Sequence, residues 1–173
     1  FEADGNFSWE RFDERYTADL ADGLGNLVSR SLAMIGKYRE GVVPVAQQNT
    51  SLDEAARKAV AAYGRAMDAC DLRGGAEAAW ELVATANLYI QQVAPWKLAK
   101  EERNAELDVA LAALARALYR LAVLTEPFIP GKAAGIRESL GVAGGTWKSL
   151  AAPPIGGAAT SRPESLFPKP SSV

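Results

Sequence analysis

The amino-acid sequence predicts an all-α protein, a bundle of about five helices. Apolar residues recur every three to four positions over long stretches, most clearly at Leu107, Leu111, Leu114, Leu118 and Leu121. No segment shows the strict apolar–polar alternation of a half-buried strand. The chain has 173 residues, 49% of them hydrophobic, which is enough for one domain with a buried core.

The first helical region is expected to start after Ser8 and to finish near Arg39. Serine is a favoured N-cap, because its hydroxyl accepts a hydrogen bond from a free backbone N–H of the first turn. Thr17 is a candidate point at which the helix restarts. Gly41 and Pro44 follow Arg39, and both residues disfavour continuation of a helix.

Three further long helices and a shorter fifth one are expected downstream. Their expected positions are residues 51–67, 76–93, 107–121 and 133–140. The Arg-Gly-Gly run at residues 73–75 is interpreted as the turn before the third of the long helices, and Cys70 as a small buried hydrophobe. Pro127 ends the fourth long helix, because proline cannot donate a backbone hydrogen bond.

The composition changes near residue 150, which divides the chain into a helical domain, residues 1–150, and a tail, residues 151–173. The tail contains five of the nine prolines together with several glycines and serines. Such a segment is unsuited to forming a helix of its own. Leu166-Phe167-Pro168 is expected to dock as an extended clip on a neighbouring surface.

The charge and residue content exclude several functions. A net charge of −2 argues against broad DNA binding, which needs a basic surface, but it is compatible with a site for a few nucleotides. With no histidine and one cysteine, no internal disulfide, cysteine-cluster metal site or imidazole catalysis is expected. No signal peptide or membrane span is recognisable, so a soluble, cytoplasmic protein is expected. The chain begins at Phe1 without a helix cap, as a piece of a longer polypeptide would.

One candidate site lies in residues 87–100, NLYIQQVAPWKLAK. Pro95 is expected to break the helix and to move Ala94 out of helical dihedral angles. Trp96 then lies at a helix corner beside Lys97, where an indole ring is suited to stacking on an unpaired base. The alternative is that Trp96 packs between two helices and that Lys97 is a solvated lysine.

A second candidate group lies on the first helical region, where Asn26 and Arg30 are four residues apart and project from one face. An amide beside a guanidinium offers donors and an acceptor suited to reading a base edge. A local hydrogen bond between the two side chains is the alternative. The nearby pair Gly23 and Gly25 is costly inside a helix, and predicts close approach by another part of the chain.

Several segments together resemble the methionyl-tRNA synthetase family. They are DGNFS at residues 4–8, TADLADGLGNLVSR at 17–30, NLYIQQVAPWKLAK at 87–100, EPFIP at 126–130 and LFPK at 166–169. The resemblance extends over essentially the whole chain, in order. It implies the C-terminal α-helical anticodon-binding domain of that class I synthetase.

The resemblance implies a role for five residues. Asn26 and Arg30 would hydrogen-bond the cytosine of a CAU anticodon and its neighbours, and Trp96 would stack on that cytosine. Asn87 and Lys97 are weaker candidates for RNA contacts, with a buried hydrogen bond as the alternative for Asn87. The implied partners are methionine tRNA and the protein's own catalytic domain, with no DNA and no membrane.

The catalytic motifs of that family are missing from these residues. The His-Ile-Gly-His-like motif and the Lys-Met-Ser-Lys-Ser loop are absent, so ATP and methionine would bind outside this chain and no catalytic residue or cofactor is assigned. Two alternatives remain open: an anticodon-binding domain of another class I synthetase, and a stand-alone helical interaction module.

Overall fold

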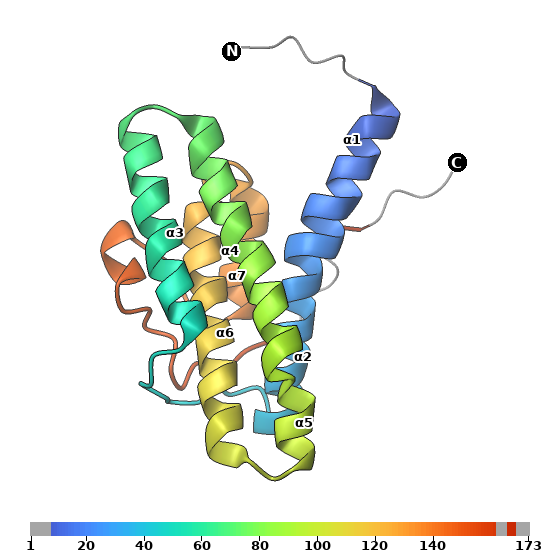
Figure 1. Ribbon diagram of the computed structural model, residues 1–173, viewed down its shortest axis with the longest axis vertical. Helices are drawn as coiled ribbons and strands as arrows, with labels where there is room; N and C mark the ends of the chain where they lie inside the picture. The colour runs from blue at the N-terminus through green and yellow to red at the C-terminus, as the bar shows by residue number, and fades with distance from the viewer. Residues whose placement is uncertain (1–7, 162–165, 169–173) are drawn as a thin grey trace.

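The computed structural model describes residues 8–161 and 166–168 and confirms the all-α prediction (Figure 1). The helical elements in chain order are α1 (Trp9–Arg15), η1 (Tyr16–Gly25), α2 (Asn26–Arg39), α3 (Ser51–Asp68), α4 (Leu72–Val93), α5 (Pro95–Lys100), α6 (Asn104–Leu124), α7 (Pro130–Ser139) and η2 (Trp147–Leu150). In the described part, the one β-type pairing is an isolated bridge between Val42 and Ala159.

The centre of the bundle is α6, which is buried on nearly all sides. It contacts α2, α3, α4, α5 and α7, and its buried residues are mostly leucine and alanine. Alanine lets neighbouring helices approach closely, while leucine fills the space between them. The helix is therefore enclosed by the others, as Figure 1 shows for α2, α3 and α4.

The N-terminal region is one continuous rod rather than two helices. Ser8 caps α1 as expected, its Oγ accepting from the Arg11 N–H at 3.3 Å. No restart occurs at Thr17, because η1 continues the rod as a π-helix and leads directly into α2. The rod ends where predicted, after Arg39, at a left-handed Glu40. Figure 1 shows α1 leaning away from the bundle at the upper right.

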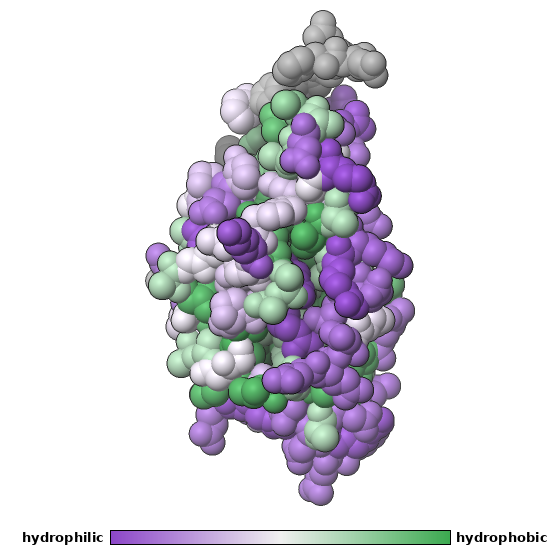
Figure 2. Space-filling model, turned by 90° about the vertical axis from the view of Figure 1, so that its left-hand side faces the viewer, coloured by the Kyte–Doolittle hydropathy of each residue, from purple (hydrophilic) through white to green (hydrophobic). Residues whose placement is uncertain are grey.

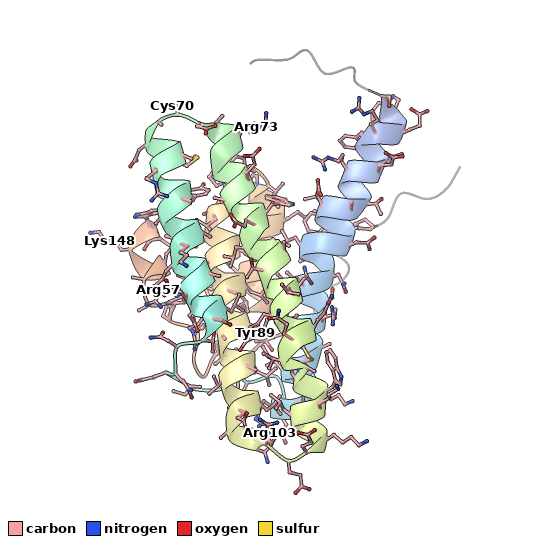
Figure 3. All side chains as sticks on the ribbon, viewed as in Figure 1. Arg57, Cys70, Arg73, Tyr89, Arg103 and Lys148 are labelled. Atoms are coloured by element: carbon pink, nitrogen blue, oxygen red, sulfur yellow. The ribbon has the colours of Figure 1, made fainter. Side chains whose placement is uncertain are left out.

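The hairpin of α3 and α4 corrects two expectations. Its turn is formed by residues 69–71 and not by 73–75, because Asp71 caps α4 by accepting from the Gly74 N–H at 2.9 Å. Gly75 is instead a contact point between the helices: a Cβ there would lie 2.7 Å from Met67 Sδ. Cys70 is exposed at the tip of the hairpin and is not part of the core (Figure 3).

The C-terminal segment packs on the same bundle. Ile155 and Phe167 belong to the buried hydrophobic core, and the Val43 N–H donates to Ala158 O at 3.0 Å. The clip, residues 166–168, thus docks on this chain's own helices. The division of the chain at residue 150 stays a prediction. On the side where α3 lies, Figure 2 shows polar residues over much of the surface, with small apolar groups among them.

Candidate nucleic-acid interface

The corner between α4 and α5 is formed by Ala94 and Pro95. Ala94 adopts left-handed dihedral angles, φ 47° and ψ 64°, and its N–H still donates to Ile90 O at 3.0 Å. Pro95 occupies the first turn of α5, where a missing N–H costs no hydrogen bond. The predicted helix break at this proline is confirmed.

The corner leaves Trp96 partly open to solvent. Pro95 and Leu98 are buried and fix α5 against the bundle, whereas the Trp96 residue is 43% exposed. Lys97 and Lys100 are exposed beside it. An indole held by buried neighbours and open on one side is suited to stacking.

Asn26 and Arg30 project from the outer side of α2. Asn26 is exposed and Arg30 half-buried, while Leu27 and Val28 between them are fully buried. Among the hydrogen bonds of the described residues, none involves either side chain, so the local Asn–Arg bond considered above is absent there. Both side chains are therefore available to an external partner.

Packing brings the two candidate groups to adjacent helices. The helices α5 and α2 are in contact, and both lie at the lower right of the bundle in Figure 1. Neither helix carries an acidic residue. Trp96, Asn26 and Arg30 thus lie on neighbouring elements, although they are 66 to 70 positions apart in the sequence.

The glycines before Asn26 are explained by the geometry of η1. In a π-helix the N–H bonds to the carbonyl five residues earlier, which widens the turn. A Cβ on Gly23 would lie 3.2 Å from Ala18 O, and one on Gly25 would lie 3.1 Å from both Leu20 O and Phe167 Cδ2. The predicted close approach is confirmed, and it comes both from the widened helix itself and from the clip.

Two side chains of α4 attach η1 to the bundle. Asn87 Nδ2 donates to Gly23 O and to Val83 O, both at 3.2 Å. Seven residues earlier on α4, Trp80 Nε1 donates to Asp19 O at 3.3 Å. The amide donors of Asn87 thus act within the chain and position η1; an RNA contact by Asn87 stays a prediction.

Four cations without an ion pair among the described residues lie on the two helices that carry Asn26, Arg30 and Trp96. Arg30, Lys37, Lys97 and Lys100 lie on α2 and α5, and no described acidic group lies within 4.0 Å of their charged nitrogens. By contrast Arg39 pairs with Asp108, and Arg103 with Glu101 and Glu106. Figure 3 places Arg103 at the same lower end of the molecule.

Sequence reasoning missed a buried charge cluster elsewhere in the bundle. Asp53 is 3% exposed and accepts from Arg116 Nε at 2.8 Å and Nη2 at 2.7 Å, and from Arg120 Nη1 at 3.4 Å. Burial raises the pKa of Asp53, but hydrogen bonds from Arg116 and Thr50 and the charge of Arg116 outweigh burial and lower it to about 2. This cluster stabilises the fold rather than the interface.

Arg116 and Arg120 also attach connecting segments to α6. Arg116 Nη1 donates to Ala46 O at 2.8 Å, and Arg120 Nε donates to Leu150 O at 2.9 Å. Among the described residues, no group of three or more His, Cys, Asp or Glu side chains could hold a metal ion. None of the helices described is long and apolar enough to cross a membrane.

Comparison with known proteins identifies related domains. The family model described as the anticodon binding domain of methionyl tRNA ligase matches residues 41–171. Methionine–tRNA ligase of Streptomyces coelicolor is 40% identical over 149 residues, which is 82% of this chain and 28% of the relative. That of Caldanaerobacter subterraneus is 36% identical over 177 residues, 98% of this chain and 28% of the relative.

Solved structures give the same result. Mycobacterium tuberculosis methionyl-tRNA synthetase in its apo form superposes with a TM-score of 0.88 at 28% identity, covering all of this chain and 37% of the synthetase. The same enzyme in complex with methionyl-adenylate gives a TM-score of 0.82 at 29% identity, covering 95% of this chain and 34% of the synthetase.

The matches differ in the part of the chain they include. The family model begins at residue 41, so Asn26 and Arg30 lie before it, whereas the Caldanaerobacter relative covers nearly the whole chain. The chain spans less than a third of the length of these curated relatives. On the family model and on these relatives, the chain belongs to the anticodon-binding domains of methionyl-tRNA ligases.

Proposed function

We propose that this chain binds the anticodon loop of methionine tRNA and reads its CAU anticodon. Trp96 stacks on the unpaired cytosine, and Asn26 and Arg30 hydrogen-bond base edges. Sequence-specific RNA recognition uses unstacked loop bases in this way, through aromatic stacking and contacts to base edges. Family membership favours methionine tRNA over the tRNA of another class I synthetase.

The observation that carries the proposal is the exposed indole on a strained corner next to α2. A non-glycine residue in the left-handed region costs about 1–2 kcal/mol, and such residues concentrate at functional sites. Here the strained Ala94 lies two residues before Trp96, with Pro95 between them. The cost is offset by the burial of Pro95 and Leu98, which holds the indole at one place on the surface.

Lys97 is proposed to contact a phosphate next to the stacked base, and Asn87 remains a weaker candidate for such a contact. The ligase reaction, with its ATP and methionine, is proposed to take place on a catalytic domain outside these residues. The length of the relatives supports this assignment, because each is more than three times longer than the part it shares with the chain.

The test is binding of a fluorescent anticodon stem-loop. We expect the CAU loop to bind more tightly than a loop with a changed first base, and Trp96→Ala to weaken CAU binding roughly fivefold or more, since stacking contributes about 1–3 kcal/mol per base. Asn26→Ala and Arg30→Ala should reduce the preference for CAU, because each removes a contact to a base edge.

Trp147→Ala is the matched control. Trp147 is also about half exposed, but it stacks on Tyr63 at a ring-centroid distance of 6.0 Å, on the α3 side of the bundle. Its removal should leave binding of both loops unchanged. Equal and weak binding of both loops by the unaltered protein would contradict the proposal and favour a helical interaction module.

A further inference from the structure

Phe167 fills a notch that only a glycine leaves open. It is 5% exposed, its ring meets the Tyr16 ring edge-on at a centroid distance of 6.4 Å, and Lys132 Nζ lies 5.5 Å from its centroid. A Cβ on Gly25 would lie 3.1 Å from Phe167 Cδ2. The ring therefore occupies the space above the last residue of η1.

The residue after this notch is Asn26. Its N–H donates both to Ala21 O, five residues earlier, and to Gly23 O, so the π-helical bond pattern extends to the start of α2. An α-helix turns about 100° per residue, so a change of one residue in register would turn a side chain at this junction by about that angle. The direction of Asn26 consequently depends on the register of η1.

The clip and Asn26 also line one surface hollow. This hollow, about 320 Å³ in volume, lies between Asn26 and Ser29 on one side and Leu166 and Phe167 on the other. Leu166 is itself seated on α7, where a Cβ on Gly135 would lie 3.1 Å from Leu166 Cδ2. The clip thus links α7 to the junction that carries the candidate base reader.

We propose that Phe167 is a positioning residue for Asn26. By filling the notch at Gly25 it stabilises the π-helical register of η1, and it thereby fixes the direction in which Asn26 faces the RNA. The α4 side chains Trp80 and Asn87 hold η1 from another side, so the register is fixed at several points. The consequence for RNA rests on the proposed function, whereas the consequence for the register does not.

Two readouts test this role in Phe167→Ala. Amide hydrogen exchange followed by NMR should give severalfold faster exchange of the Asn26 N–H, because Ala21 O, one of its two acceptors, is no longer held in place. In stem-loop binding, the ratio of affinities for the CAU loop and for a first-base variant should fall roughly fivefold. This factor corresponds to about 1 kcal/mol, the lower end of the range for one base-edge contact.

Ile155→Ala is the matched control. Ile155 is 2% exposed in the same C-terminal segment, but it lies beside residues 44–46 and α6 and not beside η1. Its truncation should lower the free energy of unfolding comparably without selectively changing Asn26 exchange or the CAU preference. If Phe167→Ala does not fold, Phe167→Leu, which keeps an apolar side chain but not the ring, takes its place.

The outcomes separate the two proposals. A folded Phe167 variant with unchanged Asn26 exchange and unchanged CAU preference overturns the positioning role. If the unaltered protein itself shows no CAU preference, the proposed function fails, and the exchange measurement alone decides whether Phe167 sets the register.

Discussion

Asp53 connects segments that are far apart in the chain. It forms a capping box with Thr50 at the start of α3 and receives a bidentate bond from Arg116 on α6. Through Arg116 and Arg120 it is linked to the carbonyls of Ala46 and Leu150. A buried carboxylate with these partners is stabilising as an anion, whereas its removal would leave the guanidinium groups of buried Arg120 and part-buried Arg116 undercompensated.

The lowered pKa of Asp53 predicts a loss of stability in acid. Because the folded pKa is about 2 and the ordinary value 3.8, the carboxylate contributes about 2 kcal/mol at neutral pH, fully present above pH 4 and lost as the pH falls toward 2. Asp53→Asn should lower the free energy of unfolding by about 3–5 kcal/mol at pH 7. Urea titrations between pH 7 and 2 measure both effects.

The difference between the two proteins should shrink below pH 4, because the unaltered protein then loses its carboxylate charge as well. Glu77→Gln is the control, since Glu77 pairs with Arg73 on the exposed surface, where solvent screening leaves an ion pair little effect on stability. Parallel pH profiles for the unaltered protein and Asp53→Asn would contradict the role of Asp53.

At the scale of residues, the candidate interface has a local pattern in the sequence, whereas the Asp53 cluster has none. Asn26 and Arg30 are four positions apart, and Pro95 adjoins Trp96, so each group has a local pattern. Asp53 and Arg116 are 63 positions apart. A pair at that separation leaves no periodic or spacing signal, and appears only when α3 packs on α6.

The corner between α4 and α5 is the element whose backbone is most directly testable. Ala94 is buried with a positive φ of 47°, a region that β-branched residues strongly avoid. Ala94→Val should therefore lower the free energy of unfolding by about 2 kcal/mol or more. Ala94→Gly should be nearly neutral, because relief of strain and added unfolded-state entropy oppose each other.

Ala84→Val is the control for the valine substitution, because Ala84 is exposed in the middle of α4 and has ordinary helical surroundings. It should cost only the difference in helix propensity, about 0.7 kcal/mol or less. Chemical denaturation measures all three variants. Equal losses for valine at both positions would mean that the corner is not strained.

Helix ends were predictable where a single residue decides them, and not where packing decides. Ser8 predicts the start of α1, and Pro95 predicts the break between α4 and α5; the structure has both. The pattern at Gly74 and Gly75 predicts a turn, but both glycines lie inside α4, where Gly75 lets Met67 approach. Gly23 and Gly25 signalled a close approach, yet a π-helical register has no signature in apolar periodicity.

At the scale of the whole molecule, a net charge of −2 coexists with a group of cations on α2 and α5 that are unpaired in the described part of the chain. Most described arginines are neutralised by ion pairs within the chain, whereas four cations on α2 and α5 are not. Other described cations also lack an ion pair, but they lie on other elements: Arg11, Lys58, Arg65, Lys132 and Lys148. The proposed interface therefore offers RNA phosphates the four cations of α2 and α5. Electrostatic binding is then limited by the number of these cations and not by the overall charge.

This distribution predicts a shallow salt dependence of stem-loop binding. Each phosphate contact to a single strand contributes about −0.7 to the slope of log K against log salt concentration, so at most four contacts give a slope of about −3 or shallower. Lys37→Ala should reduce the slope by roughly one contact's contribution.

Lys58→Ala, which changes an exposed lysine on α3, is the control and should leave the slope unchanged. A slope steeper than about −5 would mean that a much larger surface binds the RNA backbone, and that α2 and α5 do not define the interface.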